Sequence, residues 1–187
     1  MVRNCDAVGI TEMHVTPGEN SLRTHWNTSQ GAEKWVYIRT HNSVEDSCVH
    51  LKSTGFRLVA ADLSDKATDF RDVDYTQATA LVMGSELFGV SDETLSFVDQ
   101  QISIPMMGVT QSLNVSVACA IVLYEAQRQR QLAGMYDHCR LDDETLARQR
   151  FEWLHPVLTV YCKKHGLAYP ALDESGDLAE PMPRAEF

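Results

Sequence analysis

The stretch from Ile102 to Ala118 constrains the fold of this 187-residue chain more than any other. Apolar and polar residues alternate over 102–106, which predicts a strand, and a proline and a glycine then predict an irregular loop. An apolar helical pattern follows, from Asn114 to about Arg130. A strand that continues through a loop into a helix leaves backbone N–H and C=O groups exposed at its carboxyl end. We therefore expect a pocket for a polar ligand there.

Short polar side chains gather in this loop, namely those of Gln111, Ser112 and Asn114. Asn114 directly precedes the helical pattern, where N-cap residues belong. Capping the helix is therefore the simplest interpretation of Asn114 taken alone. A role in binding needs support from other parts of the chain.

A second glycine-bearing turn follows the apolar segment Ala80–Met83 and contains Gly84, Glu86 and Gly89. It is neither a dinucleotide fingerprint nor a phosphate-binding P-loop, because the required glycine and lysine spacing is absent. On composition alone it is an ordinary strand-to-helix turn with Glu86 in solvent. We interpret the polar segment Arg3–Gly9 as a third turn of this kind.

Segments of strand length alternate with helical segments along the chain. Strands are predicted at 10–16, 35–39, 57–63, 80–83 and 102–106, and helices at 42–54, from Ser91, from Asn114 and at 142–164 with an interruption at Pro156. Residues 17–33 are predicted to form a long polar loop. Strands separated by helices indicate an α/β fold, with a parallel sheet flanked by helices on both faces.

Composition narrows the class of protein. The sequence has neither an apolar run long enough to span a membrane nor a signal-peptide pattern, so we expect a soluble, cytoplasmic protein with no membrane partner. The five cysteines are widely spaced without a C-x-x-C pair, which favours free thiols over disulfides or zinc. The histidines form no helical H-x-x-x-H pair, and we expect no metal site.

The net charge of −10 is unusual for a nucleic-acid-binding protein, because neutralising phosphates needs cations. Residues 167–187 contain five acidic residues and one basic residue, and we interpret them as a solvated, partly disordered tail. Positive charges gather elsewhere, at Arg3, Arg128, Arg130, Lys163 and Lys164.

The segments Arg3–Gly9, Leu81–Gly89 and Ile102–Ala118 together closely resemble the three motifs of the SpoU-type RNA ribose 2'-O-methyltransferases, members of the knotted SPOUT superfamily. The run Gln111–Ser116 is the most diagnostic piece. The helix end over 123–136 resembles the branch that methylates a D-loop guanosine of tRNA. The resemblance covers residues 3 to about 136.

This resemblance implies that S-adenosylmethionine is the methyl donor and tRNA the substrate. It places the donor in the loops after three strands, held largely by backbone groups, at the matching positions Ala61, Gly84, Ile104 and Leu113.

It also implies catalytic roles for four side chains, Arg3, Ser112, Asn114 and Glu86. Arg3 would contact the target phosphate and help to activate the hydroxyl group. Ser112 and Asn114 would orient the ribose, the donor and Arg3, and Glu86 would hold the geometry of its loop.

For the fold, the resemblance implies a C-terminal deep trefoil knot, which no periodicity argument could predict because knots are nearly absent from proteins. We expect residues 1–136 to form the SPOUT methyltransferase domain and residues 137–187 to form a C-terminal helix and the acidic tail. The segment Val115–Ala126 is apolar nearly all round, so it must be buried on most sides. The family's homodimer would bury it, and a fully buried helix in a monomer is the alternative.

The chain departs from the family at its start. Relatives carry an N-terminal helical extension, and their first motif opens with an Asn about six residues before the Arg, whereas this sequence begins two residues before Arg3. We expect either a longer reading frame or partial loss of the site. Asn4 also stands where the family usually has Thr.

Three alternatives stay open on the sequence alone. The chain could be a catalytically weak RNA-binding relative, a methyltransferase for rRNA or for another tRNA position, or a plain α/β nucleotide-binding module without an RNA substrate.

Overall fold

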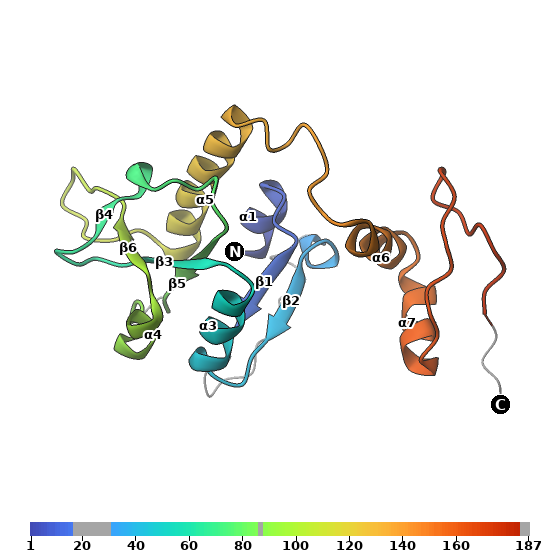
Figure 1. Ribbon diagram of the computed structural model, residues 1–187. Helices are drawn as coiled ribbons and strands as arrows, with labels where there is room; N and C mark the ends of the chain where they lie inside the picture. Colours follow the sequence, from blue (N-terminus) through green and yellow to red (C-terminus); the bar gives the residue numbers. More distant parts are fainter. Residues whose placement is uncertain (17–30, 86–87, 184–187) are drawn as a thin grey trace. The chain divides into compact units, whose positions relative to one another are not determined.

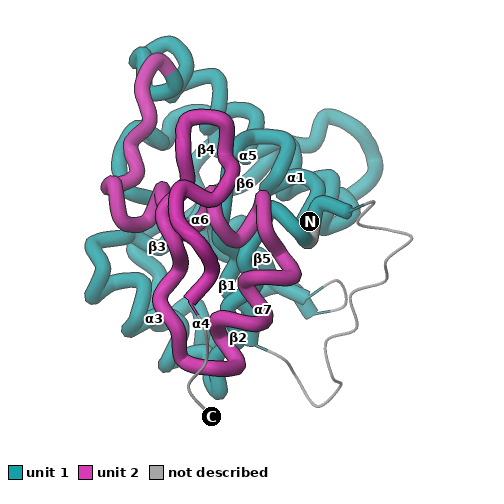
Figure 2. Tube along the Cα trace, turned by 90° about the vertical axis from the view of Figure 1, so that its right-hand side faces the viewer, with its two compact units in different colours: residues 1–136 teal, residues 137–187 magenta. Residues whose placement is uncertain are grey.

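The computed structural model describes residues 1–16, 31–85 and 88–183 of the chain. It divides into two compact units, Met1–Tyr136 and Asp137–Phe187, coloured teal and magenta in Figure 2. Most of the predicted polar loop at 17–33 lies outside the described residues, and so does Glu86.

The first unit is built on parallel strands (Figure 1). A four-stranded sheet has the order β4-β6-β3-β5, and a two-stranded sheet pairs β1 with β2. The strands are β1 Glu12–Val15, β2 Tyr37–Thr40, β3 Arg57–Ala61, β4 Thr68–Asp69, β5 Thr79–Met83 and β6 Gln100–Ser103. Ala61 lies opposite both Met83 and Ile102, so β3, β5 and β6 end at nearly the same level.

Helices cover both faces of this sheet. In the first unit they are α1 Val2–Ala7, α3 Val44–Ser53, α4 Asp92–Phe97 and α5 Val115–Leu132, with short 3-10 helices η1 Ala32–Lys34 and η2 Phe70–Asp72. Figure 1 shows α1 and α5 on one face and α3 and α4 on the other. The predicted parallel sheet flanked by helices is confirmed, whereas the trefoil knot stays a prediction.

The core follows from this arrangement. Leu58, Val59 and Ala60 are completely buried, as expected for a central parallel strand covered on both faces. Val59 and Ile102 pack against Val122 of α5 in one cluster. A second cluster joins α1 to α5, and it includes Cys5, Val8, Val36, Cys119 and Leu123.

Two local predictions were wrong. The segment Arg3–Gly9 is not a turn, because residues Val2–Ala7 form α1, whose residues Val2 and Cys5 pack in the second cluster before Gly9 adopts φ +75°. The strand predicted at 102–106 instead spans Gln100–Ser103. It ends there because its partners β3 and β4 end opposite Ile102 and Ser103.

The second unit contains α6 Asp143–Leu154 and α7 Pro156–His165, and the predicted interruption at Pro156 is confirmed. The following residues fold back on α6, because the ring of Tyr169 stacks on Phe151 at 4.6 Å between centroids. The Tyr169 hydroxyl also donates to Glu152 at 2.8 Å. The described part of the acidic tail therefore begins packed on this unit, and its carboxylates are exposed. Among the residues that the structure describes, no helix combines the length and apolarity that a membrane span requires.

Candidate functional site

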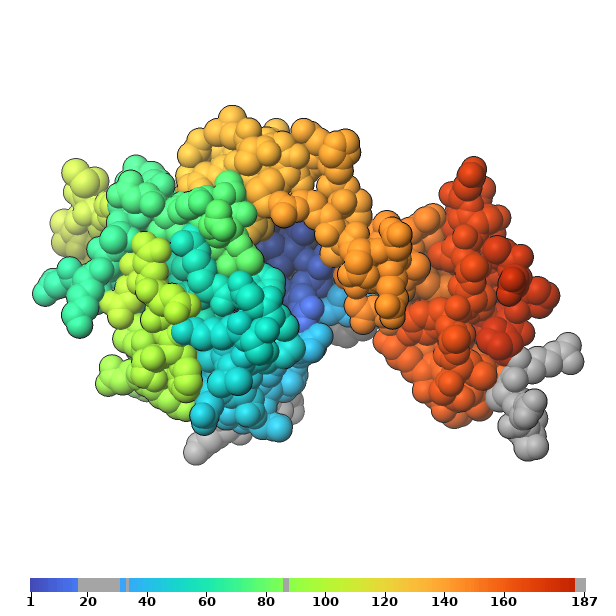
Figure 3. Space-filling view, viewed as in Figure 1, coloured from blue at the N-terminus to red at the C-terminus, as the bar shows by residue number. Residues whose placement is uncertain are grey.

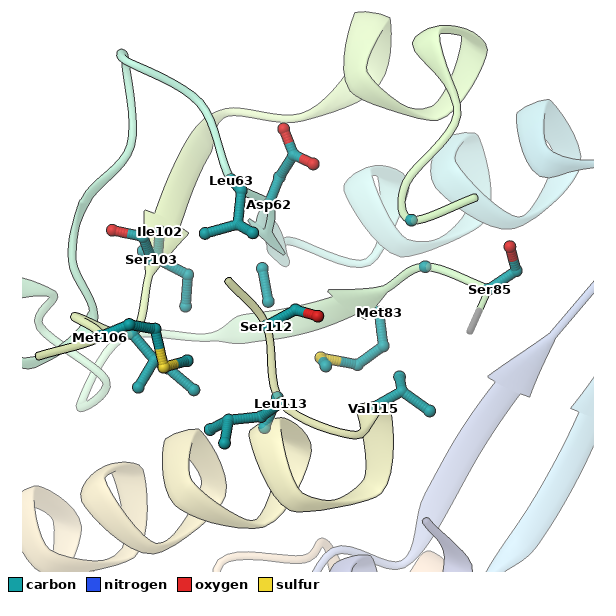
Figure 4. Close-up of a pocket in the computed structure, with 15 residues that line it drawn as sticks. Asp62, Leu63, Met83, Ser85, Ile102, Ser103, Met106, Ser112, Leu113 and Val115 are labelled. Carbon is teal, nitrogen blue, oxygen red and sulfur yellow. The ribbon is translucent and has the colours of Figure 1, made fainter. Parts of the chain in front are cut away.

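A cavity of about 350 Å³ opens where the carboxyl ends of β3, β5 and β6 meet the loop before α5 (Figure 4). All four positions predicted to hold the methyl donor line it, namely Ala61, Gly84, Ile104 and Leu113. Ser112 lines it as well. The structure thus brings together residues from three loops that are distant in the sequence.

Gly84 occupies a place that no side chain could share. A Cβ atom there would lie 2.0 Å from the carbonyl carbon of Gly89, which is far below any real contact. Ser85 and Gly89 exchange two backbone hydrogen bonds, of 2.8 and 3.0 Å, and these close the turn. Gly89 adopts φ +66°, which glycine tolerates without strain. The glycines therefore shape this side of the cavity.

Asn114 caps α5, because its Oδ1 atom accepts a hydrogen bond from the backbone N–H of Ser116 at 2.9 Å. The simplest interpretation of this residue is therefore confirmed. Asn114 does not line the cavity, but it follows directly on Ser112 and Leu113, which do. A cap that fixes the start of α5 also fixes the loop that carries these two residues.

Arg3 lies on α1, is exposed, and is not among the residues that line the cavity. The next residue ties α1 to α5, because Asn4 Nδ2 donates to the carbonyl oxygen of Ser116 at 2.7 Å. Cys5 packs beside it in the core, and burial raises the pKa of its thiol to about 11. Cys5 is therefore a neutral packing residue at neutral pH.

Comparisons with known proteins agree with this geometry. The family model described as the SpoU rRNA Methylase family matches residues 1–124, and the SpoU rRNA methylase C-terminal model matches residues 128–181. The chain belongs to the SpoU methylase family.

Two relatives within the SpoU family carry the name of one specific tRNA methyltransferase. The tRNA (guanosine(18)-2'-O)-methyltransferase of Escherichia coli K12 is 44% identical over 180 residues, which cover 95% of this chain and 79% of that protein. The enzyme of the same name from Thermus thermophilus is 47% identical over 154 residues, or 82% of this chain and 79% of that protein.

Solved SpoU structures share the fold. The A. aeolicus TrmH/SpoU tRNA modifying enzyme aligns with a TM-score of 0.74 at 39% identity, over 89% of this chain and 81% of that one. The SpoU methyltransferase AviRb from Streptomyces viridochromogenes, in complex with the cofactor AdoMet (S-adenosylmethionine), aligns with a TM-score of 0.62 at 30% identity. That alignment covers 70% of this chain and 54% of AviRb.

The carboxyl-terminal half of α5, which lies within the resemblance over 123–136, is hydrogen-bonded to the segment around Tyr75. Gln129 accepts from the backbone N–H of Tyr75 at 2.9 Å and donates to the carbonyl of Val73 at 3.0 Å. Arg130 donates to the carbonyl of Tyr75 at 2.9 Å. Arg128 pairs with the mostly buried carboxylate of Glu125 at 2.7 Å, which lowers the pKa of that carboxylate. The positive charge of Arg128 is thus largely offset by Glu125.

Sequence reasoning missed several residues that line the cavity: Asp62, Leu63, Ser85, Ser103 and Met106. Most of them stand within two residues of the end of β3, β5 or β6. Their location just after a predicted strand was therefore the sequence signal that could have identified them as cavity residues. In Figure 4, Ser112 and Met83 lie near the middle of the cavity, between its two sides.

Three imidazoles gather away from the cavity, beside β1. His14 Nδ1 lies 2.8 Å from His41 Nε2, and the ring centroids of His14 and His50 are 5.5 Å apart. Within the described part of the chain, no group of three or more His, Cys, Asp or Glu side chains is arranged to hold a metal ion. Burial lowers the pKa of His14, Glu12 opposes that shift, and the neighbouring Arg39, His41 and His50 add to it.

This lowered pKa predicts a loss of stability in mild acid. A histidine that binds protons less readily when folded than when unfolded contributes stability above its unfolded pKa, and that contribution is lost as pH falls towards the folded pKa. The free energy of unfolding should therefore fall from about pH 7.5 to pH 5, through the ordinary histidine pKa of about 6.5. In His14→Gln, the free energy of unfolding measured with urea should depend less on pH over this range. An equally steep profile in the variant would assign the titration to other groups.

Proposed function

We propose that this chain transfers the methyl group of S-adenosylmethionine to the ribose 2'-hydroxyl of a tRNA guanosine, guanosine 18 of the D-loop. The observation that carries the proposal is the meeting of Ala61, Gly84, Ile104 and Leu113 in one cavity at the strand ends. The E. coli and T. thermophilus relatives named for this activity support the substrate.

The cavity suits the donor in size and chemistry. Its volume lies in the range of small-molecule sites. Ile104 and Leu113 offer apolar surface for an adenine ring, while Ser112 and the backbone groups of the loop offer hydrogen bonds. When bound, S-adenosylmethionine supplies the reactive methyl group, so the residues of the chain have to bind, orient and exclude water.

The polar residues around the cavity act on the RNA. The 2'-hydroxyl exists only in RNA, which fixes the class of substrate. Ser112 and Asn114 hold the ribose in line with the donor. Arg3 clamps the target phosphate and stabilises the negative charge that develops on the hydroxyl oxygen as it bonds to the methyl carbon. The hydroxyl proton passes to water, and S-adenosylhomocysteine is the leaving group. A guanidinium is nearly always protonated, so this electrostatic role is the simplest for Arg3.

Methyl transfer tests the proposal. Folded protein, S-adenosylmethionine with a radiolabelled methyl group and an unmodified tRNA transcript should give labelled tRNA. A transcript with 2'-deoxyguanosine at position 18 is the control and should give none. Binding of the donor without transfer to any RNA would support a catalytically weak RNA-binding relative. Absence of donor binding at millimolar concentration would leave a nucleotide-binding module.

We further propose that the chain forms a homodimer through α5. Val117 and Tyr124 are 47% and 53% exposed, and they lie on one face of the helix because they are seven residues apart. Figure 3 shows that α5, in orange, lies at the surface of the first unit. A large apolar side chain and an aromatic ring on a helix of the core are typical of a surface that a second copy covers.

Breaking this apolar face should separate the subunits. Val117→Glu combined with Tyr124→Glu buries charge in the proposed interface, so light scattering should report the monomer mass at micromolar protein. Val49→Glu is the matched control, because Val49 is also 53% exposed but lies on α3, across the sheet. The control should keep the dimer mass. A monomer mass for the unmodified chain would contradict the proposed assembly.

A further inference from the structure

One side chain connects the two elements that carry the proposed catalytic residues. Asn4 Nδ2 on α1 donates to the carbonyl oxygen of Ser116 on α5 at 2.7 Å, across 112 residues of sequence. The N–H of the same Ser116 donates to Asn114 Oδ1 at 2.9 Å. Two asparagine side chains, one on α1 and one at the N-cap of α5, therefore bond to the backbone C=O and N–H groups of Ser116.

The hydrogen bond from Asn4 to Ser116 gives α1 a directional restraint that apolar packing does not supply. Helix α1 has only six residues, and its N-cap makes no side-chain hydrogen bond. Cys5 and Val8 bury it against α5, but apolar contact is not directional. The Tyr136 hydroxyl donates to the carbonyl of Val8 at 3.2 Å and holds the far end of α1. Asn4 holds the end next to Arg3, and a hydrogen bond has a preferred direction.

We propose that Asn4 is a positioning residue, which holds α1, and with it Arg3, in a fixed place against the first turn of α5. The proposal rests on the proposed function for the roles of Arg3 and Asn114.

Asn4→Asp tests this directly, because it keeps the shape of the side chain but replaces the N–H donor with an acceptor that faces a carbonyl. We expect kcat for tRNA methylation to fall by about 100-fold, the typical cost of a small misplacement of a catalytic group. The Kd of S-adenosylmethionine should stay unchanged, because Asn4 does not line the cavity. Asn4→Thr keeps a donor and should retain more activity than Asn4→Asp.

The matched control is Asn42→Asp, which makes the same change of charge at an exposed asparagine before α3. It should leave kcat, KM and the Kd of the donor as in the unmodified chain. Amide hydrogen exchange provides a readout that needs no activity. In Asn4→Asp the amides of α1 should exchange faster, while those of α3 should keep their rates.

The outcomes separate this proposal from the proposed function. Unchanged kcat in Asn4→Asp would overturn the positioning role, and so would a fall in kcat matched by an equal loss of donor binding and of thermal stability. If the unmodified chain methylates no tRNA, the proposed function fails. Amide hydrogen exchange alone then tests whether Asn4 anchors α1. Faster exchange confined to α1 would then support the anchoring by Asn4, and unchanged exchange would overturn it.

Discussion

Arg3→Ala and Asn114→Ala are each expected to lower kcat for tRNA methylation by 10²–10³-fold, roughly 3–4 kcal/mol, the usual loss for one charge-stabilising or positioning contact. Binding of S-adenosylmethionine should change far less, because neither side chain lines the cavity. The loss of binding in Asn114→Ala should be the larger of the two, because its cap fixes the loop that carries Ser112 and Leu113. Single-turnover transfer from radiolabelled donor measures the rate, and calorimetry measures the binding. Rate loss without binding loss would show that both residues act on the RNA.

Each residue has its own control. Asn114→Ala also removes the cap of α5, which is typically worth about 1 kcal/mol of stability. Asn114→Asp keeps a capping oxygen, so a slow but stable Asp variant would assign the rate loss to the lost amide rather than to the cap. Arg3→Lys keeps the charge but not the planar fork of the guanidinium. Full activity of Arg3→Ala would show that the assignment of the first motif is wrong.

Gly84→Ala is expected to abolish measurable binding of S-adenosylmethionine at millimolar ligand. The added methyl group would lie 2.0 Å from the carbonyl carbon of Gly89, and backbone cannot yield as a flexible side chain can. The Ser85–Gly89 turn would have to move, and with it one side of the cavity. Calorimetry on folded protein measures the loss, with circular dichroism to verify the fold.

Gly108→Ala is the matched control, because a Cβ at Gly108 meets no atom within 4 Å and its φ is not in the left-handed region. This variant should bind the donor as the unmodified chain does. Wild-type binding by Gly84→Ala would instead move the donor site away from this cavity.

Signals that lie within a few residues were predicted well from the sequence. Asn114 directly precedes α5, and Gly84 directly follows β5, as their local patterns indicated. Pro156 has no N–H to donate and starts a new helix, as expected. In each case the deciding physics is the chain's own backbone geometry.

Structural features that depend on residues distant in the sequence were not predicted. The end of β6 is set by where β3 and β4 end, and the alternation of apolar residues over 102–106 does not contain that information. Helix α1 was misassigned because its six residues are too short for a periodic signal and are held by α5. The cavity residues Asp62 and Leu63 lie outside the three motif segments, and only the pairing of β3 with β6 places them at the same edge of the sheet as Ser103.

Helix α5 connects the cavity loop to the segment around Tyr75. Its first residue follows the loop of the cavity, and near its far end Gln129 and Arg130 hold the segment around Tyr75. Its 18 residues make a rod of about 27 Å. A small tilt at the Gln129 end would move the Ser112 loop at the other. Substitutions that slow methyl transfer should therefore be found along the whole helix, including positions that touch neither donor nor RNA.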